Sequence, residues 1–327
     1  MCFNRGYNDM KKFSEIVSNK ECLYRYRPYK EEHLDALKKD RLYFSNPKDF
    51  NDPYDNLLFA NSNRIVSYIL GNINSNMDSY LEKNVKDVYP YNIAKFMWNK
   101  NKDKMLDDHK ERVFAAVDAV RVNLKNNSRI ICFSEVYDSM LMWSHYAYYH
   151  EGFLLVYDKE SLKKAKRYNI NGEEVDEKTR LMPVRYVSEQ TDMTNDVRDY
   201  VRVNVFDNMG DIGNGDASIP AHVLRDVITE KAMDWSYEKE WRLIPRVVYI
   251  EKESKLGYIS CKPLAVIIGS QCQGENREEL ISICRGINIP VYGIYLSESD
   301  ADFRLKINDD GNLEMASNKY IFIPPKR

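Results

Sequence analysis

In the first part of the chain, short extended segments are followed by a longer region with helical periodicity. Residues 23–27, Leu-Tyr-Arg-Tyr-Arg, have the composition of a strand that stops at Pro28. Residues 31–39 predict a short helix, and residues 42–45 predict a second strand that runs into turn-forming Asn-Pro sequence. From about residue 57 to residue 128 the pattern becomes helical. One face of that region is apolar, because aliphatic residues recur at helical spacing: Val113, Val117, Val120 and Leu124.

The second part of the chain mixes strands and helices. Residues 129–134 predict a buried strand, residues 139–152 a helix capped by Asp138 or Ser139, and residues 153–157 another strand. Further elements are predicted as follows: strands at 184–187, 241–244 and 247–250 and near Leu305 and Tyr320, a loop at 209–216, a helix at 219–233, and a strand–helix–strand unit over 264–296. With no internal repeat and no clear linker, the pattern predicts a single α+β domain over residues 1–327, with a helical insertion at about 57–128.

Composition narrows the class of protein. The 327 residues carry a formal net charge of −2. This argues against a protein whose whole surface binds nucleic acid or anionic lipid, because such proteins usually have an excess of basic residues. With 43% hydrophobic and 30% charged residues, the chain reads as globular, and no run approaches the roughly 20 apolar residues of a membrane span. The N-terminal residues have no apolar signal core, and the six cysteines form no Cys-x-x-Cys pair. We therefore expect a cytoplasmic protein without a membrane partner.

The segment over residues 235–244, Trp-Ser-Tyr-Glu-Lys-Glu-Trp-Arg-Leu-Ile, has the strongest potential for chemistry. Side chains at positions i and i+2 of a strand share a face, so Glu238, Glu240 and Arg242 are expected to line one face together. Two adjacent carboxylates suit a reaction that develops positive charge on a sugar carbon, since one stabilises the cation and the other orients a nucleophile. The alternative, which these residues alone favour, is an exposed charge ladder on an edge strand.

Alternating tyrosines and arginines form a second candidate site. Arg25 and Arg27 share one face of the predicted strand and could hold a diphosphate through bidentate contacts. Tyr24 or Tyr26 could stack on a base or a nicotinamide ring. An ordinary strand whose arginines form surface ion pairs explains the same residues.

Two other segments are better explained by structure than by chemistry. His145 lies in the aromatic helix around Trp143 and Tyr146, where a buried, hydrogen-bonded histidine is a simpler interpretation than a general base. The Asn- and Asp-rich stretch over residues 44–55 predicts a rigid loop, and its spacing does not match an EF-hand, so no metal is expected. Neither Gly-x-Gly-x-x-Gly nor a P-loop occurs.

Five segments together resemble a large bacterial family of domains of unknown function. They are Leu-Tyr-Arg-Tyr-Arg-Pro at 23–28, Phe-Ser-Asn-Pro-Lys-Asp-Phe-Asn-Asp-Pro-Tyr-Asp at 44–55, Cys-Phe-Ser-Glu at 132–135, Met-Trp-Ser-His-Tyr-Ala at 142–147 and Tyr-Glu-Lys-Glu-Trp-Arg-Leu-Ile at 237–244. This resemblance names no activity.

The order of these segments is similar to that of ADP-ribosyltransferases, with a strand bearing Arg, a strand bearing Ser and finally Glu-x-Glu. The resemblance implies a split, mostly antiparallel β-sandwich that binds NAD without a Rossmann fold. It implies that Arg25 contacts NAD phosphate or ribose and that Ser134 helps to orient the nicotinamide ribose. Glu240 would hold a ribose hydroxyl in the transition state, and Glu238 would orient the target. Ser134 lies in Cys-Phe-Ser-Glu and not in the family's Ser-Thr-Ser, and Arg27 could replace Arg25. The helical region at 57–128 has no counterpart.

The resemblance therefore predicts cleavage of the nicotinamide–ribose bond of NAD, with ADP-ribose transferred to an unknown acceptor or to water. It also implies a nucleotide-binding set: Tyr26, Arg27, Ser45, Ser134, Trp143 and Tyr146. In bacteria such chemistry often belongs to toxins or antiviral defence. Two alternatives remain: a non-catalytic module that binds a nucleotide or a partner, and a nucleic-acid-processing enzyme that uses the basic run at 163–167.

Overall fold

The computed structural model describes residues 11–84, 88–176, 178–203, 219–245, 256–297, 301 and 303–308. They divide into two compact units. The sheet unit comprises Met1–Ser45, Arg129–Val184 and Met233–Arg327, and the helical unit comprises Asn46–Ser128 and Arg185–Ala232. The expectation of a single domain is not tested by this division and stays a prediction.

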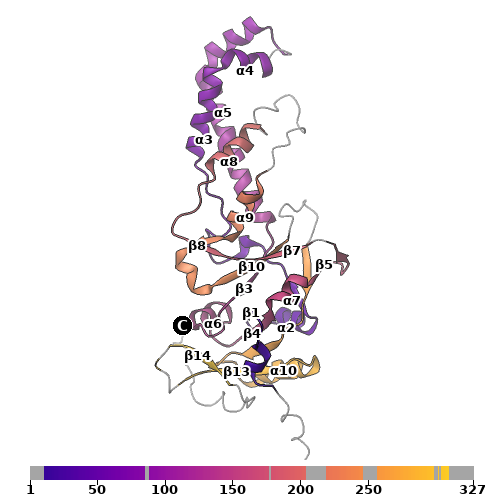
Figure 1. Ribbon diagram of the computed structural model, residues 1–327. Coiled ribbons are helices and arrows are strands. Elements are labelled where there is room, and N and C mark those ends of the chain that lie inside the picture. The colour runs from indigo at the N-terminus through magenta and orange to yellow at the C-terminus, as the bar shows by residue number, and fades with distance from the viewer. Residues whose placement is uncertain are drawn as a thin grey trace, which may run out of the picture. The chain divides into compact units, whose positions relative to one another are not determined.

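A large, mostly antiparallel sheet forms the centre of the sheet unit (Figure 1). Its strand order is β14-β13-β12-β4-β1-β3-β10-β7. The strands are β1 (Cys22–Arg27), β3 (Ile131–Ser134), β4 (Phe153–Asp158), β7 (Thr179–Pro183), β10 (Glu240–Pro245), β12 (Ala265–Ile268), β13 (Val291–Leu296) and β14 (Leu305–Ile307). Among the described strands of this sheet, only β12 and β13 pair in parallel, and helix α10 (Gly274–Gly286) connects them along the chain.

A second sheet of the same unit has the order β2-β11-β5-β6. Its strands are β2 (Arg41–Tyr43), β5 (Lys166–Asn169), β6 (Glu174–Val175) and β11 (Leu256–Ser260). The remaining helical elements of the sheet unit are α1 (Phe13–Val17), α2 (Glu31–Lys38), α6 (Met140–Tyr146), α7 (Lys159–Lys164) and the 3-10 helix η3 (Met233–Glu238).

Each face of the large sheet is covered by its own apolar cluster. On one face, strand residues such as Leu23 and Leu243 pack with Leu34 of α2, Leu280 of α10 and Ile259 of the second sheet. On the other face, strand residues pack with the helices that carry Phe13 and Trp143. Side chains alternate between the two faces of a strand, and here both faces are covered. The sequences of the central strands are therefore nearly continuous apolar runs. We call these the α2 face and the α6 face.

The helical unit is built around α5 (Tyr91–Asn127), which runs beside α3 (Ser62–Ser75) (Figure 1). The apolar stripe at Val113, Val117, Val120 and Leu124 is buried, as its spacing predicts. The unit's other elements are η1 (Pro47–Asp49), α4 (Met77–Asn84), α8 (Thr194–Val201), α9 (Ala221–Thr229) and the parallel strands β8 (Arg185–Val187) and β9 (Glu230–Ala232).

The α+β class and most of the predicted elements are confirmed. Four details differ. Glu238 lies in η3 and not on the strand, and the helix predicted over 219–233 ends at Thr229, directly before β9. The helix predicted over 139–152 ends at Tyr146, and His145, interpreted as buried, is exposed. The elements predicted at 209–216, 247–250 and Tyr320 fall outside the described residues. Within the part described, no helix is both long and apolar enough to cross a membrane.

Candidate functional site

Strands β1, β3 and β10 lie side by side, and they carry most of the predicted site residues. Ser134 pairs directly with Tyr24 on one neighbouring strand and with Glu240 on the other. Residues that face each other across an antiparallel pair point to the same side of the sheet. Ser134 and Glu240 therefore share the α6 face, where Tyr26 and Trp143 also lie.

Ser134 connects the end of β3 to the turn that precedes β10 through hydrogen bonds. Its Oγ donates a hydrogen bond of 2.6 Å to the backbone oxygen of Glu238 and accepts one of 3.1 Å from the nitrogen of Val136. Its side chain is buried. The serine thus fixes the backbone that carries both candidate carboxylates.

Glu240 forms a buried ion pair with Arg242 on the same strand. Nε of Arg242 donates to Oε1 at 2.9 Å and its Nη2 donates to Oε2 at 3.0 Å, which is the bidentate geometry of a strong charge-assisted pair. Arg242 is fully buried and Glu240 is 6% exposed. Burial, followed by the charge of Glu240, raises the pKa of the neighbouring Cys132 thiol well above its ordinary value. An exposed charge ladder is therefore not what this strand forms.

Glu238 reaches the same face from η3. It is 2% exposed, and the hydroxyl of Tyr146 donates to its Oε1 at 2.5 Å. The next residue, Lys239, adopts a left-handed backbone with φ of 43°, which is unusual for a residue with a side chain. This turn takes Glu238 out of the strand. Strained backbone of this kind concentrates at functional sites.

Tyr26 and Trp143 form part of the buried aromatic core beneath these carboxylates. Their rings meet edge to face with centroids 5.3 Å apart. The Tyr26 hydroxyl donates to the oxygen of Val136 at 2.8 Å, and the Trp143 indole donates to the oxygen of Tyr137 at 2.7 Å. Burial raises the pKa of Tyr26. Both residues are thus buried with satisfied polar groups, and they shape the site from below.

The remaining predicted residues lie elsewhere. Arg25 and Arg27 alternate with Tyr24 and Tyr26 and therefore point to the α2 face. Ser45 pairs through its backbone with Ile130, next to the start of β3. The structure thus brings Tyr26, Ser134, Trp143, Tyr146, Glu238 and Glu240 to one face of the sheet and leaves Arg25, Arg27 and Ser45 outside that group.

The acidic loop at residues 44–55 is held by interactions within the helical unit. Asp52 accepts a bond of 2.9 Å from the nitrogen of Tyr54, and Asp55 lies 3.6 Å from the ammonium of Lys231, with both charged groups buried. No group of three or more His, Cys, Asp and Glu side chains suited to a metal ion occurs within the described ranges.

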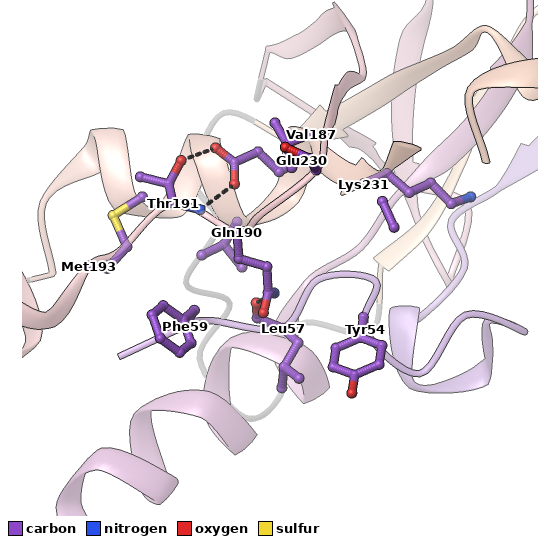
Figure 2. A pocket seen from close by; sticks show the side chains of 12 residues that line it. Tyr54, Leu57, Phe59, Val187, Gln190, Thr191, Met193, Glu230 and Lys231 are labelled. Atoms are coloured by element: carbon purple, nitrogen blue, oxygen red, sulfur yellow. Dashed lines mark hydrogen bonds between the residues drawn. The ribbon is translucent and has the colours of Figure 1, made fainter. Parts of the chain in front are cut away.

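A pocket in the helical unit had no signal in the sequence. It encloses about 270 Å³ and is lined by apolar and polar side chains that include Leu57, Phe59, Val187, Gln190, Met193 and Lys231 (Figure 2). Its walls come from stretches far apart in the chain, so no local motif marks it.

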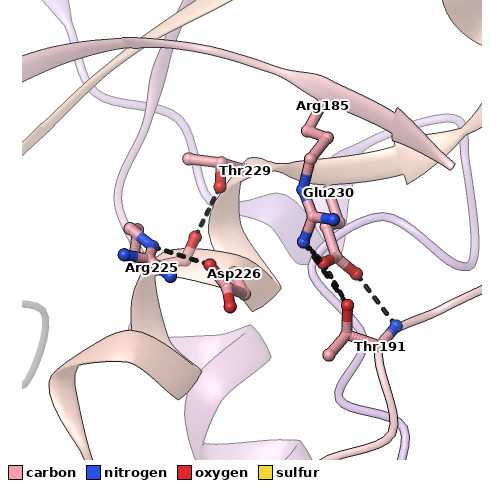
Figure 3. Close-up of polar contacts among 6 residues, drawn as sticks. All are labelled: Arg185, Thr191, Arg225, Asp226, Thr229 and Glu230. Carbon is pink, nitrogen blue, oxygen red and sulfur yellow. Dashed lines mark hydrogen bonds and ion pairs between the residues drawn. The ribbon is translucent and has the colours of Figure 1, made fainter.

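Glu230, at the start of β9, organises one wall of this pocket. One carboxylate oxygen accepts from the nitrogen of Thr191 at 3.1 Å, and the other accepts from the Thr191 hydroxyl and from Arg185 (Figure 3). In the preceding helix, Thr229 donates to the oxygen of Arg225 at 2.8 Å, and Arg225 pairs with Asp226. Glu230 thus ties the loop after β8 to β9.

Residues 142–243 match the model of a protein family of unknown function, DUF2971. No curated protein and no solved structure matches the chain. The matched stretch contains Trp143, Tyr146, Glu238 and Glu240, whereas Tyr26 and Ser134 precede it. The match supports the expected resemblance to a family without an assigned function, and it adds no activity.

Proposed function

We propose that the chain is an ADP-ribosyltransferase-like protein that binds NAD on the α6 face, cleaves the nicotinamide–ribose bond and transfers ADP-ribose to an acceptor or to water. The observation that carries the proposal is the register that sets Ser134 directly opposite Glu240, on a strand that also borders β1. The strands to which the resemblance assigns Arg, Ser and Glu are thus neighbours in one sheet. A split β-sandwich of the ADP-ribosyltransferase kind belongs to the same proposal.

The two carboxylates suit the charges of this reaction. When the glycosidic bond breaks, its electron pair leaves with nicotinamide, which departs neutral, and positive charge develops on the ribose carbon. The bidentate contact with Arg242 keeps Glu240 ionised and fixed, so that its negative charge opposes the new positive charge. The nucleophile then donates an electron pair to that carbon and loses its proton to Glu238, which Tyr146 orients.

Arg25, Arg27 and Ser45 have no role in this site. The resemblance assigns NAD phosphate to Arg25, but its side chain lies on the α2 face, across the sheet from Glu240. The proposal therefore depends on the α6 face alone.

The direct test is nicotinamide release from NAD, measured by chromatography. Glu240→Met alone leaves Arg242 as a buried charge, so the informative variant is the double substitution Glu240→Met with Arg242→Met. We expect it to fold and to lose at least about 100-fold in rate. Glu238→Gln should keep nicotinamide release and lose transfer to an acceptor. Glu160→Gln, at an exposed carboxylate of the same unit, should keep the full rate. A folded double variant with the wild-type rate, or a wild-type protein without release, refutes the proposal.

The rival functions give different results in the same experiments. A binding module would bind NAD without releasing nicotinamide. A nucleic-acid enzyme would bind RNA or DNA with steep salt dependence. Its basic run at 163–167 crosses from α7 into β5, and Lys163 and Lys166 each pair with a carboxylate, so the run does not form one basic helix face.

A further inference from the structure

Arg25 and Arg27 point to the same side of β1, on the α2 face, at positions two residues apart. Two such positions on a strand are separated by roughly 7 Å, which is close enough for both guanidinium groups to bind one small ligand. Arg25 is 4% exposed, and Arg27 is only partly exposed. A pair of cations is therefore enclosed between the large sheet and the elements that cover it.

Among the described residues, no carboxylate forms an ion pair with Arg25 or Arg27. Arg25 donates from Nη1 to the backbone oxygen of Cys132 at 3.0 Å, and its buried Nε has no hydrogen-bond partner. In the described part of the chain, Arg27 makes no side-chain hydrogen bond and no ion pair. The nearest acidic influence on Arg27 is the charge of Glu32, whose side chain is 71% exposed and makes no ion pair with either arginine. Arg25 also lies over the ring of Phe133, 5.6 Å from its centroid.

An enclosed pair of like charges is costly without a counter-ion. Removing a charged group from water costs several kcal/mol in real proteins, and proteins therefore pair or coordinate buried charges. Burial and then the charge of Arg25 lower the pKa of Arg27 well below its ordinary value, so the Arg27 charge is unfavourable in the absence of a counter-ion. Burial and the charge of Arg27 also lower the pKa of His33. Such a site attracts an anion.

We propose that Arg25 and Arg27 bind a phosphate group, either as inorganic phosphate or as the phosphate of a small metabolite. A phosphate has enough oxygens to accept from two guanidinium groups at once, and its two negative charges match the two arginines. The ligand enters beside Arg27, the more exposed of the two, and Arg25 forms the floor. The site lies on the face opposite Glu240, so it is separate from the proposed NAD site and does not depend on it.

The test is thermal unfolding of the full chain in inorganic phosphate, against sodium chloride of equal ionic strength. At ten times its Kd, phosphate should raise the melting temperature by about 2 °C. Arg27→Met should abolish this rise and, without phosphate, should melt at or above the wild-type temperature, because an uncompensated and partly buried charge is removed. Arg112→Met, at an exposed arginine of α5, should keep the rise.

A wild-type protein that phosphate does not stabilise, or an Arg27→Met protein that keeps the full rise, overturns the proposal. So does a variant that unfolds well below the wild type without phosphate, because Arg27 would then be structural. The same measurement with glycerol 3-phosphate distinguishes inorganic phosphate from the phosphate of a small metabolite as the ligand. An effect equal to that of inorganic phosphate supports a free phosphate ligand, and a stronger effect supports a phosphorylated metabolite. Nicotinamide release is not measured, so failure here leaves the proposed function to its own test.

Discussion

The ion pair between Glu240 and Arg242 gives a prediction whose size follows from burial. Both groups lie on β10, Arg242 is fully buried and Glu240 is 6% exposed, and two hydrogen bonds of 2.9 and 3.0 Å join them. Removing one partner of such a pair leaves the other as an unpaired buried charge, which costs about 3–5 kcal/mol. We therefore expect Glu240→Met and Arg242→Met to lower the free energy of unfolding by that amount each.

The double substitution should cost much less than the sum of the two single ones. Replacing both partners by apolar groups of similar volume is often neutral, because no charge stays behind. We expect the double variant to lie within about 2 kcal/mol of the wild type, and the coupling free energy between the two positions to exceed about 2 kcal/mol. The measurement is urea unfolding of the four proteins, followed by tryptophan fluorescence and circular dichroism.

Two results would refute this reasoning. Single variants that each lose less than about 1 kcal/mol of unfolding free energy would mean that water or another group compensates the charge that is left without its partner. Additive losses in the double variant would mean that the residues stabilise the protein separately. The outcome also decides how the functional test is interpreted, because lost turnover in Glu240→Met alone would reflect unfolding as much as chemistry.

Three further predictions concern other parts of the two units. Gly152→Ala should lose about 3 kcal/mol or more in urea unfolding, because the new Cβ would lie 2.1 Å from the oxygen of Arg27. Lowering the pH from about 7 to 5 should reduce stability less in His150→Gln than in the wild type. Burial lowers the pKa of His150 below that of the unfolded chain, so its contribution is complete above about pH 6.5 and is lost as the pH falls. Glu230→Ala should cost about 1–3 kcal/mol, because it leaves the nitrogen and hydroxyl of Thr191 unmatched.

Each of these predictions has a matched control. Gly286→Ala should be neutral or stabilising, because no heavy atom lies within 4 Å of its new Cβ, and equal losses at both glycines would refute the close-approach argument. For the pH effect the control is the wild type in the same buffers, and a slope in His150→Gln equal to the wild-type slope would contradict the assignment to His150. Arg185→Ala should lose less than about 1 kcal/mol, since its side chain is 57% exposed, and a loss as large as that of Glu230→Ala would contradict the assignment.

Local pattern was enough to predict the helical region and every strand of the large sheet except β7, whereas β5, β6, β9 and β11 were not predicted. The apolar run before Ser134 and the spacing of Val113, Val117 and Val120 each reflect burial of a single element, so one sequence window contains the information. The turn at Lys239 could not be predicted in that way, because a left-handed lysine is stabilised by the surrounding fold and not by its own preference. Glu238 was therefore expected on the strand and lies in η3.

The face on which a site residue lies depends on strand register, which no window of sequence contains. A shift of one residue turns every side chain of a strand to the other face. Ser134 pairs with Tyr24, and this register turns Arg25 away from Glu240, although both residues were expected in one site. The pocket beside Glu230 shows the same limitation, because residues near 57, 190 and 230 meet only in the folded chain.

The large sheet separates the two charged groups that the sequence had suggested as one site. Glu240 forms an ion pair with Arg242 on the α6 face, whereas Arg25 and Arg27 have no described carboxylate partner on the α2 face. A ligand held by all of them would have to pass through the hydrogen-bonded strands, which a packed sheet does not allow. The two proposals therefore place their ligands on opposite faces of the sheet. Arg27→Met should abolish phosphate binding without changing nicotinamide release. The double variant, Glu240→Met with Arg242→Met, should abolish nicotinamide release without changing phosphate binding. Loss of both activities in either folded variant would mean that the faces are coupled, and would refute this separation.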